Sequence, residues 1–366
     1  MAKVTLNAVN KFYPTGTGGV HAVIDLSAEI EDGEFVALLG PSGCGKTSTL
    51  RMIVGLEEIT SGEILFDDVV VNDLEPQARN VAMAFETYAL YPNMTVAENI
   101  GFPLEARGIK ASERLRRVVE IAGLLDIADI LDQRPTALSG GQQQRVSLGR
   151  ALIREPAAFI LDEVMSHVDA HLKFRMLFEL KRIHQSVGRT MIYVTHDQME
   201  ALALADRVAV MKEGRLQQFA TRDELFHRPA NRFIAEFIGE PPTNFLTVRP
   251  EGAGGVVALG DVASGLSFEP SPERAGALTA GAEYILGIRP QNLTLDAEGG
   301  DASITARVEI NEYLGERRVL TLSAGDTTLL ALAPAGHAVG PGTEVELHYR
   351  REDVMLFDAG SQELIG

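Results

Sequence analysis

The sequence has almost no cysteine and lacks long apolar runs, the features of disulfide-stabilised and membrane-spanning proteins. Its 366 residues contain one cysteine, Cys44. No intramolecular disulfide can therefore form, and we expect a reducing compartment. Apolar runs stop at about five or six residues, which is too short for a membrane-spanning helix, and the first residues do not resemble a signal peptide. We therefore expect any membrane role to depend on a partner.

Basic residues are also scarce. There are 33 Lys plus Arg against 51 Asp plus Glu, a net charge of −18. A surface this acidic argues against binding of nucleic acid or anionic lipid, so protein partners are expected. Residues 240–366 hold 8 Arg, no Lys and 19 acidic residues, a net −11, which leaves −7 for residues 1–239. The chain therefore divides into two parts of different composition.

The sequence does contain a phosphate-binding loop, GPSGCGKT, at residues 40–47. It follows an apolar strand predicted over residues 35–39 and precedes a helix predicted from residue 48. Glycines let such a loop turn its N–H groups toward a phosphate at a helix N-terminus. Lys46 is expected to reach the β- and γ-phosphates, and the Thr47 hydroxyl to bind Mg²⁺. A chance glycine-rich turn would lack this strand and helix, so the pattern predicts a nucleotide site.

Two carboxylates follow a second apolar strand. Residues 158–161 read as a buried strand, and Asp162 and Glu163 come directly after it. Parallel sheets place ligands at the carboxyl ends of their strands. Asp162 is expected to hold Mg²⁺, and Glu163 to orient or deprotonate the attacking water. By itself such a pair would more often be a solvated strand end, but the phosphate loop favours the functional interpretation.

The hydrophobic pattern predicts an α/β protein with a β-rich C-terminal part. Strands alternate with amphipathic helices up to about residue 239. Further strands are predicted at residues 191–194 and 208–211, and a helical insertion lies between residues 92 and 150. After residue 239, apolar-polar alternation predicts small-domain strands at residues 304–310, 318–322 and 344–349. The Gly/Ala-rich residues 253–263 are expected to form a loop.

A third motif, LSGGQQQR at residues 138–145, resembles the signature loop of ATP-binding cassette (ABC) ATPases. Ser139, Gly140 and Gly141 open a predicted helix, where exposed N–H groups suit an anion. The resemblance implies that this anion is ATP bound to the opposite subunit of a head-to-tail dimer. Taken alone, the same three residues would be an ordinary helix cap.

The resemblance covers the whole chain and implies a set of functional residues. His196, in THD at residues 195–197, corresponds to the switch histidine that orients the water. Tyr13 corresponds to the aromatic residue that stacks on adenine, and Asp169 to the dimer-interface loop. The implied catalytic residues are Glu163, His196 and Glu86. The implied ATP contacts are Tyr13, Pro41, Ser42, Gly43, Cys44, Gly45, Lys46, Thr47, Ser48, Ser139, Gly140, Gly141, Gln142 and Asp169. The implied Mg²⁺ ligands are Thr47, Glu86 and Asp162.

Residues 237–246 and 286–291 resemble the maltose and glycerol-phosphate importer ATPases in particular. This implies a P-loop ABC ATPase core over residues 1–239, with a helical subdomain at about 90–150. An oligonucleotide-binding-like (TOBE-type) β domain over residues 240–366 would follow and regulate or stabilise the dimer. The implied partners are membrane-spanning permease subunits, an external solute-binding protein and a second ABC ATPase, either identical or paralogous. The location would be the cytoplasmic face of the inner membrane, and residues 88–96 look like the segment that receives the permease.

Two segments depart from the family pattern. Glu86 stands where these ATPases have Gln, which adds charge near the γ-phosphate and removes an amide donor. Val164 replaces a proline after Glu163, and His167 replaces an asparagine. An alternative is therefore a hydrolytically impaired, ATP-gated regulatory subunit paired with an active paralogue. A cassette protein acting on DNA or ribosomes is disfavoured by the acidic charge. The sequence does not specify the solute.

Overall fold

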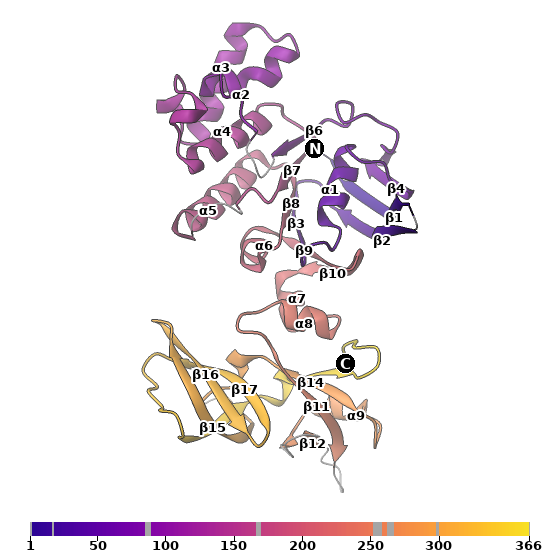
Figure 1. The fold of residues 1–366 in the computed structure, drawn as a ribbon, viewed down its shortest axis with the longest axis vertical. Coiled ribbons are helices and arrows are strands. Elements are labelled where there is room, and N and C mark those ends of the chain that lie inside the picture. Colours follow the sequence, from indigo (N-terminus) through magenta and orange to yellow (C-terminus); the bar gives the residue numbers. More distant parts are fainter. Residues whose placement is uncertain are drawn as a thin grey trace. The chain divides into compact units, whose positions relative to one another are not determined.

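The computed structural model describes residues 2–16, 18–84, 89–165, 170–251, 258–261, 267–297 and 300–365. The chain forms two compact units, residues 1–222 and 223–366 (Figure 1). The first unit contains mixed α/β structure, and the second is rich in strands. The domain boundary that composition predicts after residue 239 stays a prediction. No helix in the described segments is long and apolar enough to cross a bilayer.

A six-stranded sheet is the centre of the first unit. Its order is β10-β9-β3-β8-β7-β6, and all neighbours run parallel except β10 against β9. The strands are β3 (Phe35–Leu39), β6 (Val81–Ala84), β7 (Ala158–Asp162), β8 (Thr190–Thr195), β9 (Arg207–Lys212) and β10 (Arg215–Thr221). Every residue of β3 and β8 is buried, because a parallel sheet is covered on both faces. The strands predicted at residues 35–39, 158–161, 191–194 and 208–211 are confirmed.

Helix α1 (Lys46–Val54) begins directly after the phosphate loop and ends at Gly55. Gly55 has a φ of +85°, and its N–H donates to the carbonyls of Arg51 and Met52, as is common at helix C-termini. The buried side chains of Leu50 and Ile53 belong to the same core as β3, β7 and β8. Helix α5 (Ala170–Val187) contacts α6 (Gln198–Leu204), and α6 contacts β3.

An antiparallel sheet of order β2-β1-β4-β5 adds a second layer to this unit. Its strands are β1 (Val4–Thr15), β2 (Gly18–Ile30), β4 (Ser61–Phe66) and β5 (Val69–Val70). Val4, Leu26 and Ile64 are buried and share the core of the six-stranded sheet.

The predicted helical insertion is present. It contains α2 (Val96–Ala106), α3 (Ala111–Leu124), two short 3-10 turns (Ala128–Ile130 and Pro135–Ala137) and α4 (Gly140–Leu152). The three helices contact one another and cluster apart from β1, β2 and β4 (Figure 1). Thr95 and Glu98 form a capping box at the start of α2, which satisfies two of the N–H groups that a helix start leaves unpaired.

The second unit contains two antiparallel sheets. One has the order β13-β12-β11-β14-β19, and the other β17-β16-β15-β18. The strands of the first are β11 (Asn244–Glu251), β12 (Ala258–Asp261), β13 (Ser267–Phe268), β14 (Tyr284–Ile288) and β19 (Met355–Asp358); those of the second are β15 (Ala302–Tyr313), β16 (Arg317–Ala324), β17 (Thr327–Pro334) and β18 (Glu344–Tyr349). Apolar residues of both sheets share one core. The short helices are α7 (Arg222–His227), α8 (Arg232–Phe237) and α9 (Pro272–Gly276).

The structure confirms the predicted strands at residues 304–310, 318–322 and 344–349, but one expectation was wrong. Part of the Gly/Ala-rich segment 253–263 forms strand β12, which pairs with residues 248–251 of β11. Hydrogen bonding to a neighbouring strand outweighs the weak strand preference of glycine and alanine.

Candidate nucleotide-binding and hydrolysis site

The site lies at the carboxyl edge of the six-stranded sheet. Strands β3, β8 and β7 are parallel neighbours, so their carboxyl ends lie at one edge. The phosphate loop follows β3, Glu163 follows β7, and His196 follows β8. The topology therefore brings together three motifs that are far apart in the sequence.

Glycine is required at several points of the phosphate loop. Gly40, Gly43 and Gly45 have φ values of +157°, +79° and +106°, which residues with a Cβ rarely adopt. A Cβ on Gly40 would lie 2.3 Å from the Met211 carbonyl oxygen, and one on Gly45 would lie 2.4 Å from the Ala22 carbonyl oxygen. The loop is thus pressed against neighbouring backbone.

Lys46 is a buried cation with neutral partners. Its side chain donates to the carbonyls of Gly40 at 2.7 Å and Pro41 at 3.0 Å, and the residue is 5% exposed. Within the described ranges, no carboxylate lies at ion-pair distance from its Nζ. A buried ammonium costs free energy unless it is compensated, so this position suits a phosphate.

Cys44 packs beside Lys46, with 3.8 Å between Sγ and Nζ. Burial raises the pKa of the Cys44 thiol, although the nearby Lys46 acts in the opposite direction. A buried thiol of this kind is a packing residue rather than a nucleophile.

The start of α1 presents Thr47 and Ser48 beside Tyr13. Thr47 is exposed, and the Tyr13 hydroxyl donates to Ser48 Oγ at 3.3 Å. The ammonium of Lys11 lies 4.7 Å from the centre of the Tyr13 ring. Stacking of Tyr13 on adenine stays a prediction.

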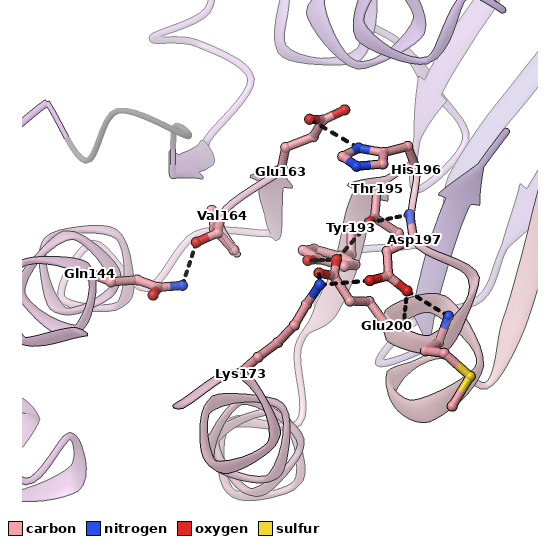
Figure 2. Close-up of polar contacts among 10 residues, drawn as sticks. Gln144, Glu163, Val164, Lys173, Tyr193, Thr195, His196, Asp197 and Glu200 are labelled. Carbon is pink, nitrogen blue, oxygen red and sulfur yellow. Dashed lines mark hydrogen bonds and ion pairs between the residues drawn. The ribbon is translucent and has the colours of Figure 1, made fainter. Parts of the chain in front are cut away.

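Glu163 and His196 form a pair, with 3.4 Å between Oε2 and Nδ1. Figure 2 shows the two side chains facing each other. The Glu163 side chain is 27% exposed and that of His196 is 55% exposed, so the pair is accessible from solvent. Glu163 has a φ of +46°, and its N–H donates to the Val194 carbonyl at 3.0 Å. Left-handed backbone at a residue other than glycine is a form of strain that clusters at active sites.

A buried polar network supports the histidine loop. The hydroxyls of Tyr193 and Thr195 each donate to one oxygen of Glu200 at 2.5 Å, and Glu200 is 2% exposed. The Lys173 ammonium lies 2.5 Å from the other Glu200 oxygen and 2.6 Å from Asp197. Lys173 comes from α5, so the network joins α5 to the segment around His196 (Figure 2).

The network shifts three pKa values. Burial alone would lower the pKa of Lys173, but hydrogen bonds to Asp197 and Glu200 raise it overall. Burial would raise the pKa of Asp197, but Lys173 and the N–H groups of α6 lower it overall. Burial and the Glu200 carboxylate raise the pKa of Tyr193 well above its usual value. The Tyr193 hydroxyl therefore remains a donor at physiological pH.

The signature loop begins α4 as the sequence predicts. Ser139 is the N-cap: its Oγ accepts from the Gln142 N–H at 3.4 Å, and its own N–H donates to Gln142 Oε1 at 2.9 Å. The helix cap that we considered as the alternative is therefore present. In the described part of the chain, no hydrogen bond or ion pair joins Ser139–Gln142 to Pro41–Ser48.

Several predicted site residues remain untested. Glu86, Asp169, Tyr88 and His167 lie outside the described residues. Asp162 ends β7 at the expected edge.

Within the described ranges, no three His, Cys, Asp or Glu residues gather closely enough to hold a metal by themselves, so Mg²⁺ at Thr47 and Asp162 would also need phosphate oxygens.

Sequence reasoning missed three residues that hold the site, namely Gln144, Lys173 and Glu200. Gln144 lies within the LSGGQQQR motif, but its contact with the turn after β7 depends on tertiary packing. Glu200 lies four residues after His196, in the first turn of a short helix. An acidic residue there usually interacts with the helix dipole, so its position gave no sign of a role in the site. No local signal identified Lys173.

The chain has the site of an ATPase of the ATP-binding cassette class. Its glycine-rich loop holds a buried lysine, a carboxylate is paired with a histidine, and a signature-type helix lies in a helical insertion. Comparisons with known proteins agree. The family described as "ABC transporter" matches residues 23–166, and "TOBE domain" matches residues 286–357.

Three relatives match nearly full length. The chain is 44% identical to an sn-glycerol-3-phosphate import ATP-binding protein of Chromobacterium violaceum, covering all of this chain and 96% of the relative. It is 42% identical to a sulfoquinovosyl glycerol transport ATP-binding protein of Agrobacterium fabrum, covering all of both chains. It is 44% identical to a trehalose/maltose import ATP-binding protein of Thermococcus litoralis, covering 98% of each.

A solved dimer of an ATP-binding cassette in a post-hydrolysis state, bound to ADP and Pi, is also similar. It has a TM-score of 0.54 and 30% identity over 60% of this chain and 98% of that one. The chain belongs to the ABC transporter family, in which it is an ATP-binding subunit with a C-terminal TOBE domain.

Proposed function

We propose that this chain is the ATP-hydrolysing, energy-coupling subunit of an importer for a sugar, polyol or glycerol-phosphate-like solute. The observation that carries the proposal is the Glu163–His196 pair at the same sheet edge as the phosphate loop. The printed functions of the relatives at 42–44% identity support the solute class. They give no support to the alternative of an impaired regulatory subunit.

The chemistry follows from the residues present. Lys46 would exchange its two carbonyl partners for phosphate oxygens, where its charge is compensated. Glu163 would accept the proton of the attacking water, and His196 at 3.4 Å would hold that water against the γ-phosphate. Thr47 and Asp162, together with Glu86, would hold Mg²⁺, which neutralises developing charge on the phosphates.

We propose a head-to-tail dimer, formed by two copies or with a paralogue. Ser139–Gln142 make no contact with the chain's own phosphate loop in the described structure. The likeness to a solved cassette dimer supports the interpretation that these residues, with Asp169, meet ATP on the other subunit. ATP would then favour the closed dimer because only that state has both sets of contacts.

The docking site for a membrane-spanning permease subunit is proposed at a cavity of about 570 Å³ in the first unit. Its lining includes Tyr91, Phe102, Arg107, Arg150 and Arg154. Burial lowers the pKa of Arg150 and of Arg154. Aromatic walls beside the half-buried Arg150 and Arg154 suit an amphipathic helix that carries an acidic residue.

The chain would act on the cytoplasmic face of the inner membrane with an external solute-binding protein. The ATPase domain would extend over residues 1–239, and the β domain of residues 240–366 would stabilise or regulate the dimer. The acidic charge supports the absence of nucleic-acid binding.

Glu163→Gln tests the proposal. The full chain, purified with its permease subunits, should hydrolyse Mg-ATP, and the substitution should lower kcat by about a hundredfold or more, since it removes the general base. ATP binding should persist. Glu120→Gln, at an exposed glutamate of α3, serves as the control and should retain activity. Hydrolysis that is absent in the wild type, or unchanged by Glu163→Gln, would refute the proposal.

A further inference from the structure

The turn after β7 holds Glu163 in a conformation that needs support. Its φ is +46°, in a region that costs free energy for residues other than glycine. On one side, the Glu163 N–H donates to the Val194 carbonyl at 3.0 Å. On the other side, the chain continues through Val164, which does not restrict φ as a proline would. The turn therefore depends on hydrogen bonds from elsewhere.

Gln144 supplies such a bond. Its Nε2 donates to the Val164 carbonyl at 2.6 Å, and Figure 2 shows the amide reaching this carbonyl from α4. Val164 is 3% exposed and Gln144 is 1% exposed, so water does not compete for the bond. It connects the helix that begins at the signature loop to the residue after Glu163.

The amide of Gln144 is costly in this position. Its Oε1 is buried and has no hydrogen-bond partner among the residues that the structure describes. An unsatisfied buried acceptor opposes folding, and an apolar side chain of similar length would avoid this cost. Packing alone therefore does not explain a glutamine here, whereas the bond to Val164 does.

We infer that Gln144 is a positioning residue for ATP hydrolysis: its hydrogen bond to the Val164 carbonyl holds the strained turn that directs Glu163 toward His196. The inference rests on the proposed function, in which Glu163 is the general base. It predicts that loss of the amide donor affects the chemical step and leaves nucleotide binding intact, because Gln144 does not line the phosphate loop.

The test removes the donor with Gln144→Met, which keeps the length of the side chain, and with Gln144→Leu. In the complex with the permease subunits, each folded variant should show kcat lowered by about tenfold or more, because small displacements of catalytic groups are costly. KM for ATP should change less than about twofold, since ground-state binding is retained. Thermal unfolding and nucleotide binding are measured on the same samples.

Ser147→Ala is the matched control. Ser147 is one turn further along α4, is 3% exposed, and its Oγ has no hydrogen-bond partner within the described segments. The substitution should leave kcat unchanged. In a Glu163→Gln background, Gln144→Met should lower the residual rate no further, because groups acting as a unit are not additive.

The outcomes separate the two proposals. If Glu163→Gln abolishes turnover while a folded Gln144 variant retains wild-type kcat, the positioning role is wrong and the proposed function stands. Equal losses in the Ser147 and Gln144 variants, or a further loss in the Glu163→Gln background, would also overturn it in favour of a general packing effect. If the wild type does not hydrolyse ATP, both proposals fail.

Discussion

The carboxylate of Glu200 is buried in the network that supports the segment around His196 (Figure 2), and three donors satisfy its oxygens. Tyr193, Thr195 and Lys173 contact it at 2.5 Å. Removing one partner of a buried ion pair leaves the other charge uncompensated, and this costs more than the pair gains in stability. The network is therefore sensitive to single substitutions.

Lys173→Met should lower the free energy of unfolding by about 2–3 kcal/mol, because it leaves Glu200 without its cation. Glu200→Gln, which keeps an acceptor for both hydroxyls, should cost less. Urea denaturation at pH 7 measures both. An effect of Lys173→Met within error of wild type would mean that solvent replaces the ammonium, whose side chain is 23% exposed.

The pH dependence of the same network follows from the directions of two shifts. The pKa of Asp197 is lowered from 3.8, so its contribution to stability is complete above that value and is lost as pH falls through the folded-state pKa. The pKa of Lys173 is raised from 10.5, so its contribution is complete below 10.5 and is lost as pH rises through the folded-state value. In Lys173→Met, the decrease in unfolding free energy at low pH and the decrease at high pH should both be smaller than in the wild type. Urea denaturation at a series of pH values measures this.

At the scale of elements, one arginine fastens the helices α7 and α8 to strand β14. Arg289 follows β14 and is 3% exposed. Its guanidinium donates to the carbonyls of Phe226 at 2.7 Å and Ile238 at 2.5 Å and to the Thr243 hydroxyl at 3.3 Å, and it stacks over the Phe226 ring at 3.9 Å. Burial lowers the pKa of Arg289 to about 10, so it stays charged at neutral pH.

Arg289→Met should destabilise the chain by about 3 kcal/mol, because several buried acceptors lose their donor. Arg350→Met is a suitable control, since that side chain is 59% exposed and pairs with Glu352 and Asp353; exposed pairs of this kind contribute about 0–1 kcal/mol. Chemical denaturation compares the two. Similar losses in both variants would contradict the anchoring role of Arg289.

For the whole molecule, the net negative charge opposes the association of two copies. Two copies each carry −18, and like charge raises the free energy of bringing them together. In the proposed dimer, contacts made through ATP would have to overcome this repulsion. Salt screens it, because the Debye length falls as ionic strength rises.

Raising NaCl from about 50 to about 300 mM should increase the ATP-dependent dimer fraction of Glu163→Gln, with an association constant about threefold higher through screening. Analytical ultracentrifugation measures the fraction, and samples with ADP provide the control. A dimer that weakens with salt would show that attractive interface ion pairs outweigh net repulsion.

Much of this architecture could be predicted from the sequence. Strands β3, β7, β8 and β9 were visible as continuous apolar runs, because buried parallel strands have no polar face. The phosphate loop was recognisable in the sequence because its closely spaced glycines are needed for the backbone conformation of the loop itself. Strand β12 was missed because glycine and alanine have little preference for strands, so the residues of β12 by themselves did not indicate its pairing with residues 248–251 of β11.

Local sequence is enough to define the phosphate loop, the carboxylates after β7, the signature helix with its Ser139 cap and the acidic charge, because each depends on neighbouring residues or on composition. Only the tertiary structure brought Glu163 to His196, Gln144 to Val164 and Lys173 to Glu200. These contacts join segments separated by 20 to 33 residues. Their distances follow from the order of strands in the sheet and the packing of α4 and α5, which no local pattern encodes.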